Sequence, residues 1–249
     1  MNEYKIIFRR VGYSNTILIV NGSHSVLIDT GVKGNLFCFE YLFDQFDLSP
    51  DDIKLIILTH THYDHTGNLN ELVKLTGAKV MVHKNEYENL KKGYTPIPKG
   101  TLPFTKFISA AGKIVYPKFA SPRPFEADIV NEDEMLLYDF GIEGKVISTP
   151  GHTNGSQSVL IGDSLISGDS FVNFRNGKVF PPFANDPATL LETWQRIYNL
   201  GVKEIFPAHG DKLKVKDTYE EFEKWKNKLA VNIKPQSVLK KEYSFETRS

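Results

Sequence analysis

Three histidines and one aspartate lie within six residues of each other, in the run Thr59-His60-Thr61-His62-Tyr63-Asp64-His65. Imidazole nitrogens and carboxylate oxygens are standard protein ligands of zinc and similar divalent metals. Residues two apart in an extended segment point to the same side, so His60 and His62 can bind one metal together. Asp64 and His65 follow where the chain should turn toward a helix, so they can face a second metal. This density of ligands predicts a metal site rather than an ordinary surface loop.

Such a site needs ligands from elsewhere in the chain, and three candidates follow: His152, Asp169 and His209. Each lies just past a predicted strand and beside a glycine, where loops carry functional residues on a rigid scaffold. Any one of them alone would more often be a structural or solvated residue. Together with the first run they complete the coordination of two metals. We therefore predict a site of five histidines and two aspartates.

The elements that must position these residues are mostly strands. The apolar run 53–58 ends directly at the histidine-rich segment and predicts a buried strand. Further strands are predicted at 4–8, 16–20, 25–28, 79–83, 135–140, 145–148, 158–161, 164–167 and 204–206, and helices at 35–46, 69–75, 85–92, 187–200 and 218–230. Strands in both halves favour two sheets packed face to face with helices outside. The strand–helix–strand order of 53–83 also fits a doubly wound sheet, so pattern alone leaves both architectures open.

Composition narrows the class of partner. The chain has 249 residues, and 30 Lys and Arg balance 30 Asp and Glu, so it lacks the basic footprint that nucleic-acid binding usually demands. No apolar run is long enough for a membrane span, and the N-terminus lacks the features of a secretory signal. The lone Cys38 cannot form an internal disulfide, which is compatible with a reducing compartment. We expect one cytoplasmic domain over residues 1–249 that acts on a small molecule.

The order His60-x-His62-x-Asp64-His65, then His152, Asp169 and His209, resembles the metallo-β-lactamase superfamily, from about residue 4 to residue 230. The resemblance implies an α/β fold, the four-layer αββα sandwich, with metals at one edge of the two sheets. It implies one metal on His60, His62 and His152. It implies a second metal on Asp64, His65 and His209, with Asp169 bridging both. The metals would be two divalent ions, zinc first and iron or manganese as alternatives, and a metal-bridging hydroxide would be the nucleophile.

The resemblance also implies roles for three carboxylates, and the local sequence predicts the roles of the two remaining histidines. Asp64 and Asp169 are the carboxylates expected to act in catalysis. Asp29 matches a family motif near the metals and is expected to orient a ligand histidine, the alternative being a turn aspartate bonded to backbone. His24 and His83 are expected outside the ligand set, the first in solvent and the second in a structural role.

The aspartate at position 169 separates branches of the superfamily. Zinc β-lactamases commonly have cysteine or serine there, so the chain resembles the branch of glyoxalase II, lactonases, ribonuclease Z and persulfide dioxygenases. Flavodiiron oxygen reductases are disfavoured because they have glutamate at the position of His62, and ribonuclease Z is disfavoured by the neutral charge. Homoserine-lactone lactonases are also disfavoured, because they have tyrosine at the position of Val172. Only forty residues follow His209, too few for the glutathione-binding extension of glyoxalase II.

We therefore predict a glyoxalase II-like hydrolase of an ester, thioester or lactone. A mononuclear-iron oxidoreductase of the persulfide dioxygenase type is the alternative from another class, but such enzymes often use fewer ligands than the seven present here. A phosphodiesterase and a non-catalytic binding protein also stay open, although the latter usually loses ligands.

The segment 93–127 is the part of the chain that the resemblance does not explain. Between Glu88 and Glu126 there is no acidic residue, and seven basic residues are mixed with aromatic ones. The segment is predicted to be a lid that favours substrates with a negative group and an apolar part. One of Phe104, Phe107, Tyr116 and Phe119, and a lysine or Arg123, should then face the metals. The alternative is an insertion packed on the body or on a dimer partner.

Overall fold

A computed structural model describes residues 4–115, 122–174 and 177–231. Its strands form two six-stranded sheets. The first sheet has the order β1 (Lys5–Val11), β2 (Ser14–Val20), β3 (Ser25–Ile28), β4 (Ile53–Ile57), β5 (Lys79–His83) and β6 (Ile129–Asn131). The second has the order β12 (Leu213–Lys214), β11 (Glu204–Pro207), β10 (Ser164–Gly168), β9 (Gln157–Ile161), β8 (Lys145–Ser148) and β7 (Glu134–Leu136). Parallel pairing runs from β3 to β6 and between β10 and β11, whereas the other pairs are antiparallel.

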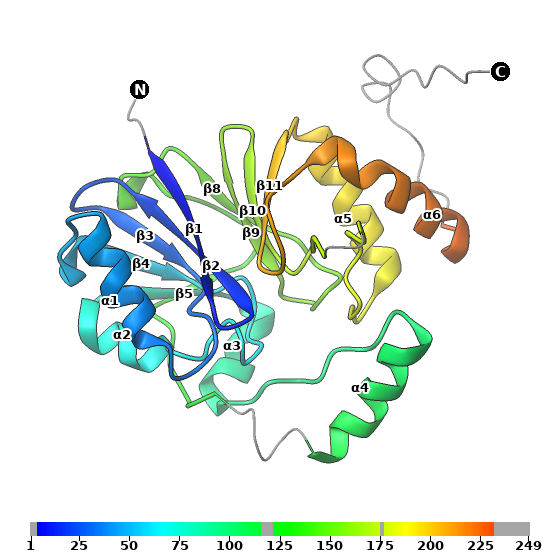
Figure 1. The fold of residues 1–249 in the computed structure, drawn as a ribbon, viewed down its shortest axis with the longest axis horizontal. Coiled ribbons are helices and arrows are strands. Elements are labelled where there is room, and N and C mark those ends of the chain that lie inside the picture. Colours follow the sequence, from blue (N-terminus) through cyan, green and yellow to red (C-terminus); the bar gives the residue numbers. More distant parts are fainter. Residues whose placement is uncertain (1–3, 116–121, 175–176, 232–249) are drawn as a thin grey trace.

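Helices lie outside both sheets (Figure 1). On the first sheet these are α1 (Leu36–Gln45), α2 (Leu69–Thr76) and α3 (Lys84–Lys92), and on the second α5 (Pro187–Asn199) and α6 (Tyr219–Leu229). Helix α4 (Pro103–Val115) stands apart from the sheets in Figure 1. Short 3-10 turns cover Pro50–Asp52, Tyr138–Phe140 and Val215–Thr218. Within the described ranges, no helix is long and apolar enough to cross a bilayer.

Strand β2 shows how the layers are held together. Side chains alternate across a strand, so Ile17 and Ile19 enter the core between the two sheets while Leu18 enters the core beneath the helices. All three are buried, and each contributes about 1.5–3 kcal/mol of hydrophobic free energy. A third core joins the second sheet to α5 and α6 around Trp194. These layers confirm the αββα sandwich, and the doubly wound alternative is wrong.

Two local expectations differ from the structure. The run 135–140 is not one strand, because β7 ends at Leu136 and a 3-10 turn follows that closes at Gly141 with a φ of 73°. The segment 93–127, in which the sequence predicts no helix or strand, contains the thirteen-residue helix α4. Proline fits the first turn of a helix, and the Thr105 hydroxyl accepts a hydrogen bond from the Leu102 amide there at 3.0 Å. Pro103 therefore begins this helix instead of preventing it.

Candidate metal centre

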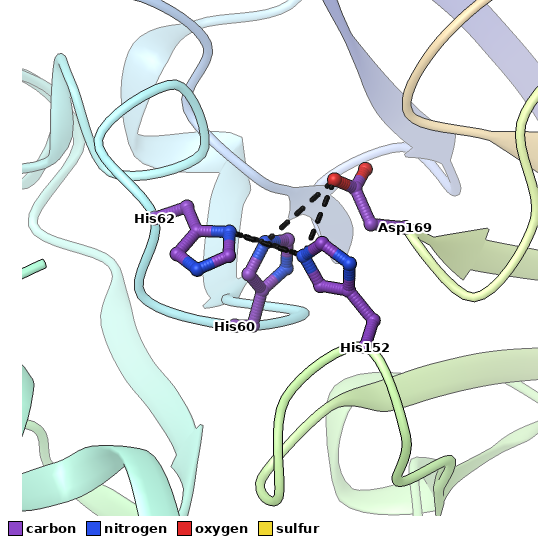
Figure 2. Close-up of side chains that lie close together, drawn as sticks. All are labelled: His60, His62, His152 and Asp169. Atoms are coloured by element: carbon purple, nitrogen blue, oxygen red, sulfur yellow. Dashed lines mark hydrogen bonds and ion pairs between the residues drawn. The ribbon is translucent and has the colours of Figure 1, made fainter. Parts of the chain in front are cut away.

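All seven predicted ligands lie in four loops at one edge of the two sheets. The loop after β4 carries four of them, and the loops after β8, β10 and β11 carry His152, Asp169 and His209. The side chains form two groups, within each of which the ligand atoms lie within 4.8 Å of one another. One group is His60, His62, His152 and Asp169, and the other is Asp64, His65 and His209. Figure 2 shows the first group pointing inward to a common point.

Three imidazole nitrogens meet in the first group. His60 Nε2 lies 2.8 Å from His62 Nδ1, and His152 Nε2 lies 3.2 Å and 3.1 Å from these two atoms. An imidazole nitrogen carries either a hydrogen or a lone pair, never both. Three nitrogens in a triangle therefore cannot all satisfy one another by hydrogen bonds. Three lone pairs directed at one cation do fit this arrangement.

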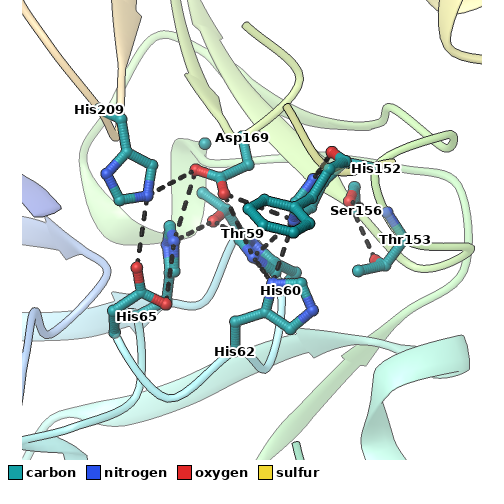
Figure 3. A network of polar contacts seen from close by, with 12 residues as sticks. Thr59, His60, His62, His65, His152, Thr153, Ser156, Asp169 and His209 are labelled. Atoms are coloured by element: carbon teal, nitrogen blue, oxygen red, sulfur yellow. Dashed lines mark hydrogen bonds and ion pairs between the residues drawn. The ribbon is translucent and has the colours of Figure 1, made fainter. Parts of the chain in front are cut away.

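Asp169 lies between the two groups (Figure 3). Its Oδ2 is 3.4 Å from His152 Nε2 and 4.0 Å from His60 Nε2. Its Oδ1 is 3.5 Å from His65 Nε2 and 3.4 Å from His209 Nε2. Each carboxylate oxygen therefore faces a different group. Asp169 Oδ1 and His65 Nε2 are buried and have no hydrogen-bond partner among the described residues, which is the state expected of metal-binding atoms shown without the ion.

Hydrogen bonds behind the rings fix which nitrogen faces inward. His65 Nδ1 donates to Asp29 Oδ2 at 2.8 Å, and His152 Nδ1 donates to the carbonyl of Phe183 at 2.9 Å. His209 Nδ1 donates to the carbonyl of Tyr13 at 3.1 Å. These acceptors carry no hydrogen, so each Nδ1 must be the protonated nitrogen. In the neutral ring each Nε2 then presents a lone pair to its group, as metal binding requires.

The two groups differ in their affinity for protons. Burial, with neighbouring imidazoles, lowers the pKa of His62 to about 3, and burial also lowers the pKa of His60 and His152. In the second group, burial alone would lower the pKa of His65, but the carboxylates of Asp29 and Asp169 outweigh it and hold that pKa well above its usual value. Asp169 likewise outweighs burial at His209 and raises its pKa to about 10. The three imidazoles of the first group are therefore neutral, whereas the second group binds protons where a cation would sit.

Asp29 confirms the expected contact with a candidate ligand. Its backbone has a φ of 60°, a left-handed conformation that an aspartate tolerates better than most residues. Its Oδ1 accepts the Thr59 amide at 2.8 Å, and its Oδ2 accepts the Thr59 hydroxyl at 2.7 Å as well as His65. Asp29 thus fixes the start of the histidine-rich loop and one of its rings at once.

Glu86 is a buried carboxylate that sequence reasoning missed. It lies in the first turn of α3, is 2% exposed, and accepts hydrogen bonds from the amide and hydroxyl of Thr61. The Thr95 hydroxyl donates to the Thr61 carbonyl at 3.0 Å. Thr61 separates His60 from His62, so these contacts fix the spacing of two candidate ligands. The sequence gives no signal for this role, because Glu86 is one of two glutamates in a charged helix.

The β1–β2 hairpin is a second support that the sequence did not reveal. The Ser14 hydroxyl donates to the Asp64 carbonyl at 2.6 Å, and the Asn15 amide donates to the Ala208 carbonyl at 2.7 Å. With the bond from His209 to Tyr13, the hairpin is connected to both loops of the second group. The remaining histidines lie as expected, with His24 exposed and His83 buried and bonded to the Glu132 carbonyl at 2.9 Å.

A cavity of about 490 Å³ opens over the two groups. The segment 93–127 contributes Ile97, Pro98 and Ile108 to its lining. Phe104 and Phe107 do not line it and are 73% and 72% exposed. Tyr116 and Phe119 lie outside the described residues, so the part of the lid prediction that rests on them stays a prediction. Arg123 pairs with Glu71 at 2.7 Å and is not among the described lining residues.

Comparison with known proteins identifies the family. The model of the metallo-beta-lactamase superfamily matches residues 9–209, which is more than half of the chain. The chain belongs to this superfamily. A relative described as a probable metallo-hydrolase, from Methanocaldococcus jannaschii, is 30% identical over 207 residues, 80% of this chain and 89% of that protein. A crystal structure of a protein in a di-iron-bound form has 26% identity and a TM-score of 0.62, covering 86% of this chain and 96% of the other.

The likeness to glyoxalase II is narrower. A hydroxyacylglutathione hydrolase of Shewanella pealeana is 28% identical over 125 residues, which cover 50% of this chain and 35% of that enzyme. Superfamily membership and the two groups of ligands indicate a metal-dependent hydrolase that uses divalent metal ions.

Proposed function

We propose that this protein uses two divalent metal ions, with zinc as the favoured metal, to hydrolyse an ester, thioester or lactone. The observation that carries the proposal is the triangle of histidine nitrogens at 2.8–3.2 Å, joined by Asp169 to a second group of ligand atoms. Buried nitrogens that cannot satisfy one another have a physical reason to converge only if a cation accepts their lone pairs.

The roles of the ligands follow from their grouping. His60, His62 and His152 would hold one ion, and Asp64, His65 and His209 the other. Asp169 would contact both, since one oxygen faces each group. Bound divalent ions supply Lewis acidity, which makes a water molecule acidic enough to act near neutral pH and stabilises negative charge developing on a carbonyl oxygen.

The protein's own part is to hold these groups and to shape the space above them. Asp29 and the carbonyls of Phe183 and Tyr13 keep three imidazoles in the tautomer whose Nε2 faces inward. Because most of the ligand side chains are buried, solvent reaches them through the cavity, where His209 is partly exposed. An acyl group bound there would bring its carbonyl to the ligand edge and displace water from the apolar lining.

The comparisons support the thioester chemistry without carrying over a substrate. The match to hydroxyacylglutathione hydrolase covers 35% of that enzyme, so its glutathione specificity is not assigned here. The di-iron form of a related fold makes iron the alternative metal to zinc. We keep zinc first because histidine and carboxylate ligands suit it and it needs no reductant.

The test begins with elemental analysis of protein purified without chelator, where about two metals per chain are expected. Protein loaded in turn with zinc, iron and manganese is then assayed on matched esters, thioesters, lactones and phosphodiesters, and iron-loaded protein is assayed for oxygen uptake with a persulfide. Turnover of a carbonyl substrate that is lost with Asp169→Ala supports the proposal. Oxygen uptake, or phosphodiester cleavage alone, would replace it by another function. One metal per chain with full activity would contradict the second site.

A further inference from the structure

We infer that Arg10 is a specificity-determining residue that binds a carboxylate at the far end of an apolar acyl substrate. The inference rests on the proposed hydrolase function and adds the substrate class. The starting observation is the charge pattern of the cavity. Among the lining residues that the structure describes, Arg10 is the one lysine or arginine, and it comes from β1 rather than from the segment 93–127.

The guanidinium of Arg10 is available to a ligand. Its Nε donates to the Gly12 carbonyl at 3.2 Å, which orients the side chain but leaves the terminal nitrogens for other contacts. Within the described ranges, no carboxylate oxygen lies within 4.0 Å of these nitrogens. The adjacent Arg9 differs, since it points away from the cavity and lies 5.1 Å from the ring centre of Tyr41.

Arg10 has a fixed place relative to the candidate ligands. It pairs with Asn15 across the hairpin, and Asn15 is bonded to the carbonyls of Ala208, Pro207 and Gly210 around His209. A shift of the β1–β2 hairpin would therefore break its hydrogen bonds with the loop that carries His209. The strand position of Arg10 is therefore fixed relative to the ligand atoms of the same cavity.

Apart from Arg10, the ligand residues and the hydroxyls of Tyr13 and Tyr63, the cavity lining is apolar. One part of the wall is Ile97, Pro98 and Ile108, and another is Phe174 with residues 181–183. The two parts are joined by backbone hydrogen bonds, from Thr101 to Pro182 at 2.9 Å and from Ala184 to Lys99 at 2.8 Å. The second part also holds a candidate ligand, because the Phe183 carbonyl accepts the hydrogen bond of His152. The wall is therefore built before a substrate arrives, which lowers the entropy cost of binding.

The three features define one class of substrate. The ligand groups would take a carbonyl, the wall would cover a chain of methylene groups, and Arg10 would take a terminal anion. One guanidinium balances one charge and offers two parallel donors to a planar carboxylate, whereas a dianionic phosphate would demand more cationic partners. The inferred substrates are esters or thioesters of straight-chain dicarboxylic acids with one carboxylate free.

The experiment compares charged and neutral substrates of equal length. The metal-loaded protein is given mono-p-nitrophenyl esters of glutaric, adipic and suberic acid, each beside its methyl-capped counterpart. At the best length the wild-type protein should prefer the free carboxylate in kcat/KM. Arg10→Met should lower this preference by about 5- to 10-fold, mainly through KM, because the contact lies away from the reacting carbonyl. Arg9→Met removes a neighbouring charge outside the cavity and should keep the preference.

An unchanged preference in Arg10→Met overturns the inference, as does an equal loss in Arg9→Met, which would indicate a general field of surface charge. If none of these esters is hydrolysed, the proposed function is decided by its own panel of esters, thioesters and lactones, and Arg10 is tested separately by calorimetric titration with suberate and monomethyl suberate. Tighter binding of suberate that is lost in Arg10→Met still supports the inferred anion site. Equal affinities of the two compounds overturn it.

Discussion

The two parts of the cavity are held in place in different ways. We call the candidate ligands its floor, and the apolar residues Ile97, Pro98, Ile108, Phe174 and 181–183 its wall. On the floor, most candidate ligands are buried, and side-chain hydrogen bonds such as that from His65 to Asp29 fix several of them. In the wall, apolar side chains such as Ile108 are partly exposed, and backbone hydrogen bonds between 97–109 and 181–184 hold them. The floor depends on residue type at each position. The wall depends on shape, which many apolar residues can supply, so we expect substitutions to alter reaction chemistry and substrate choice separately.

The largest effect on turnover is expected from a substitution among the candidate ligands, and Asp169 is the strongest case. Asp169→Ala removes the oxygens that face both groups, and it should lower turnover by more than the roughly 100- to 1000-fold that losing one preorganised contact costs. The fold should persist, because the side chain contributes no core packing. Circular dichroism checks the fold, metal content checks occupancy, and retained hydrolysis would show that Asp169 does not join the two sites.

The floor was largely predictable from the sequence because metal ligands must be particular residue types at particular spacings. The HxHxDH run therefore identified the site, and the resemblance placed His152, Asp169 and His209 with it. Glu86 and Arg10 were not found, since their roles arise from which elements pack together. A buried carboxylate beside Thr61 and a cation that lines the cavity from a hairpin have no spacing that distinguishes them from other charged residues.

The wall was predictable only in outline. An acid-free segment rich in aromatics predicted apolar contacts near the metals, and Ile97, Pro98 and Ile108 do line the cavity. The expected aromatic contacts fail at Phe104 and Phe107, because α4 buries Thr105 and Ser109, which bond to Leu102 and Pro98, and leaves these two rings exposed. Helix orientation depends on tertiary packing, which the composition of a segment does not determine.

The two groups of candidate ligands should differ in how their metal affinity depends on pH. A metal at the Asp64, His65 and His209 group must displace protons that are held there, since the pKa of His209 is raised to about 10 and that of His65 is raised as well. For each proton displaced, affinity at this group should therefore fall by about tenfold for each unit that pH drops below the raised pKa. The His62 group competes with no proton until pH approaches its pKa of about 3, so its affinity should stay nearly flat from pH 8 to pH 5.

Metal content after equilibrium dialysis at stepped pH measures this difference. The expected course is loss of one metal per chain as pH falls, with the other retained. Simultaneous loss of both metals would mean that the two groups bind as a single unit.

Asp29 tests whether contacts behind the floor matter as much as the ligands. Asp29→Ala removes the acceptor that fixes the ring of His65, and it should weaken metal binding at the second group by about 10- to 100-fold. Asp29→Asn is the matched control, because the amide oxygen can still accept from His65 and should restore part of the affinity. Competition with a chelator of known affinity measures both variants. Equal and complete losses would instead indicate that the charge, rather than the orientation, holds the metal.

The smallest expected effect lies in the wall, at two adjacent residues of α4. Ile108 lines the cavity, whereas Phe107 does not and is 72% exposed. Ile108→Ala removes three carbon atoms of the lining, but the side chain is 41% exposed, so only part of the usual ~2 kcal/mol for burying an isoleucine is at stake. We expect kcat/KM for long-chain acyl esters to fall by about threefold relative to acetyl esters, with metal content unchanged. Phe107→Ala removes a larger apolar side chain from the same helix and should leave that ratio unaltered. If both substitutions lower the ratio equally, α4 acts through its packing on the body, and the division between a chemical floor and a selective wall does not extend to this helix.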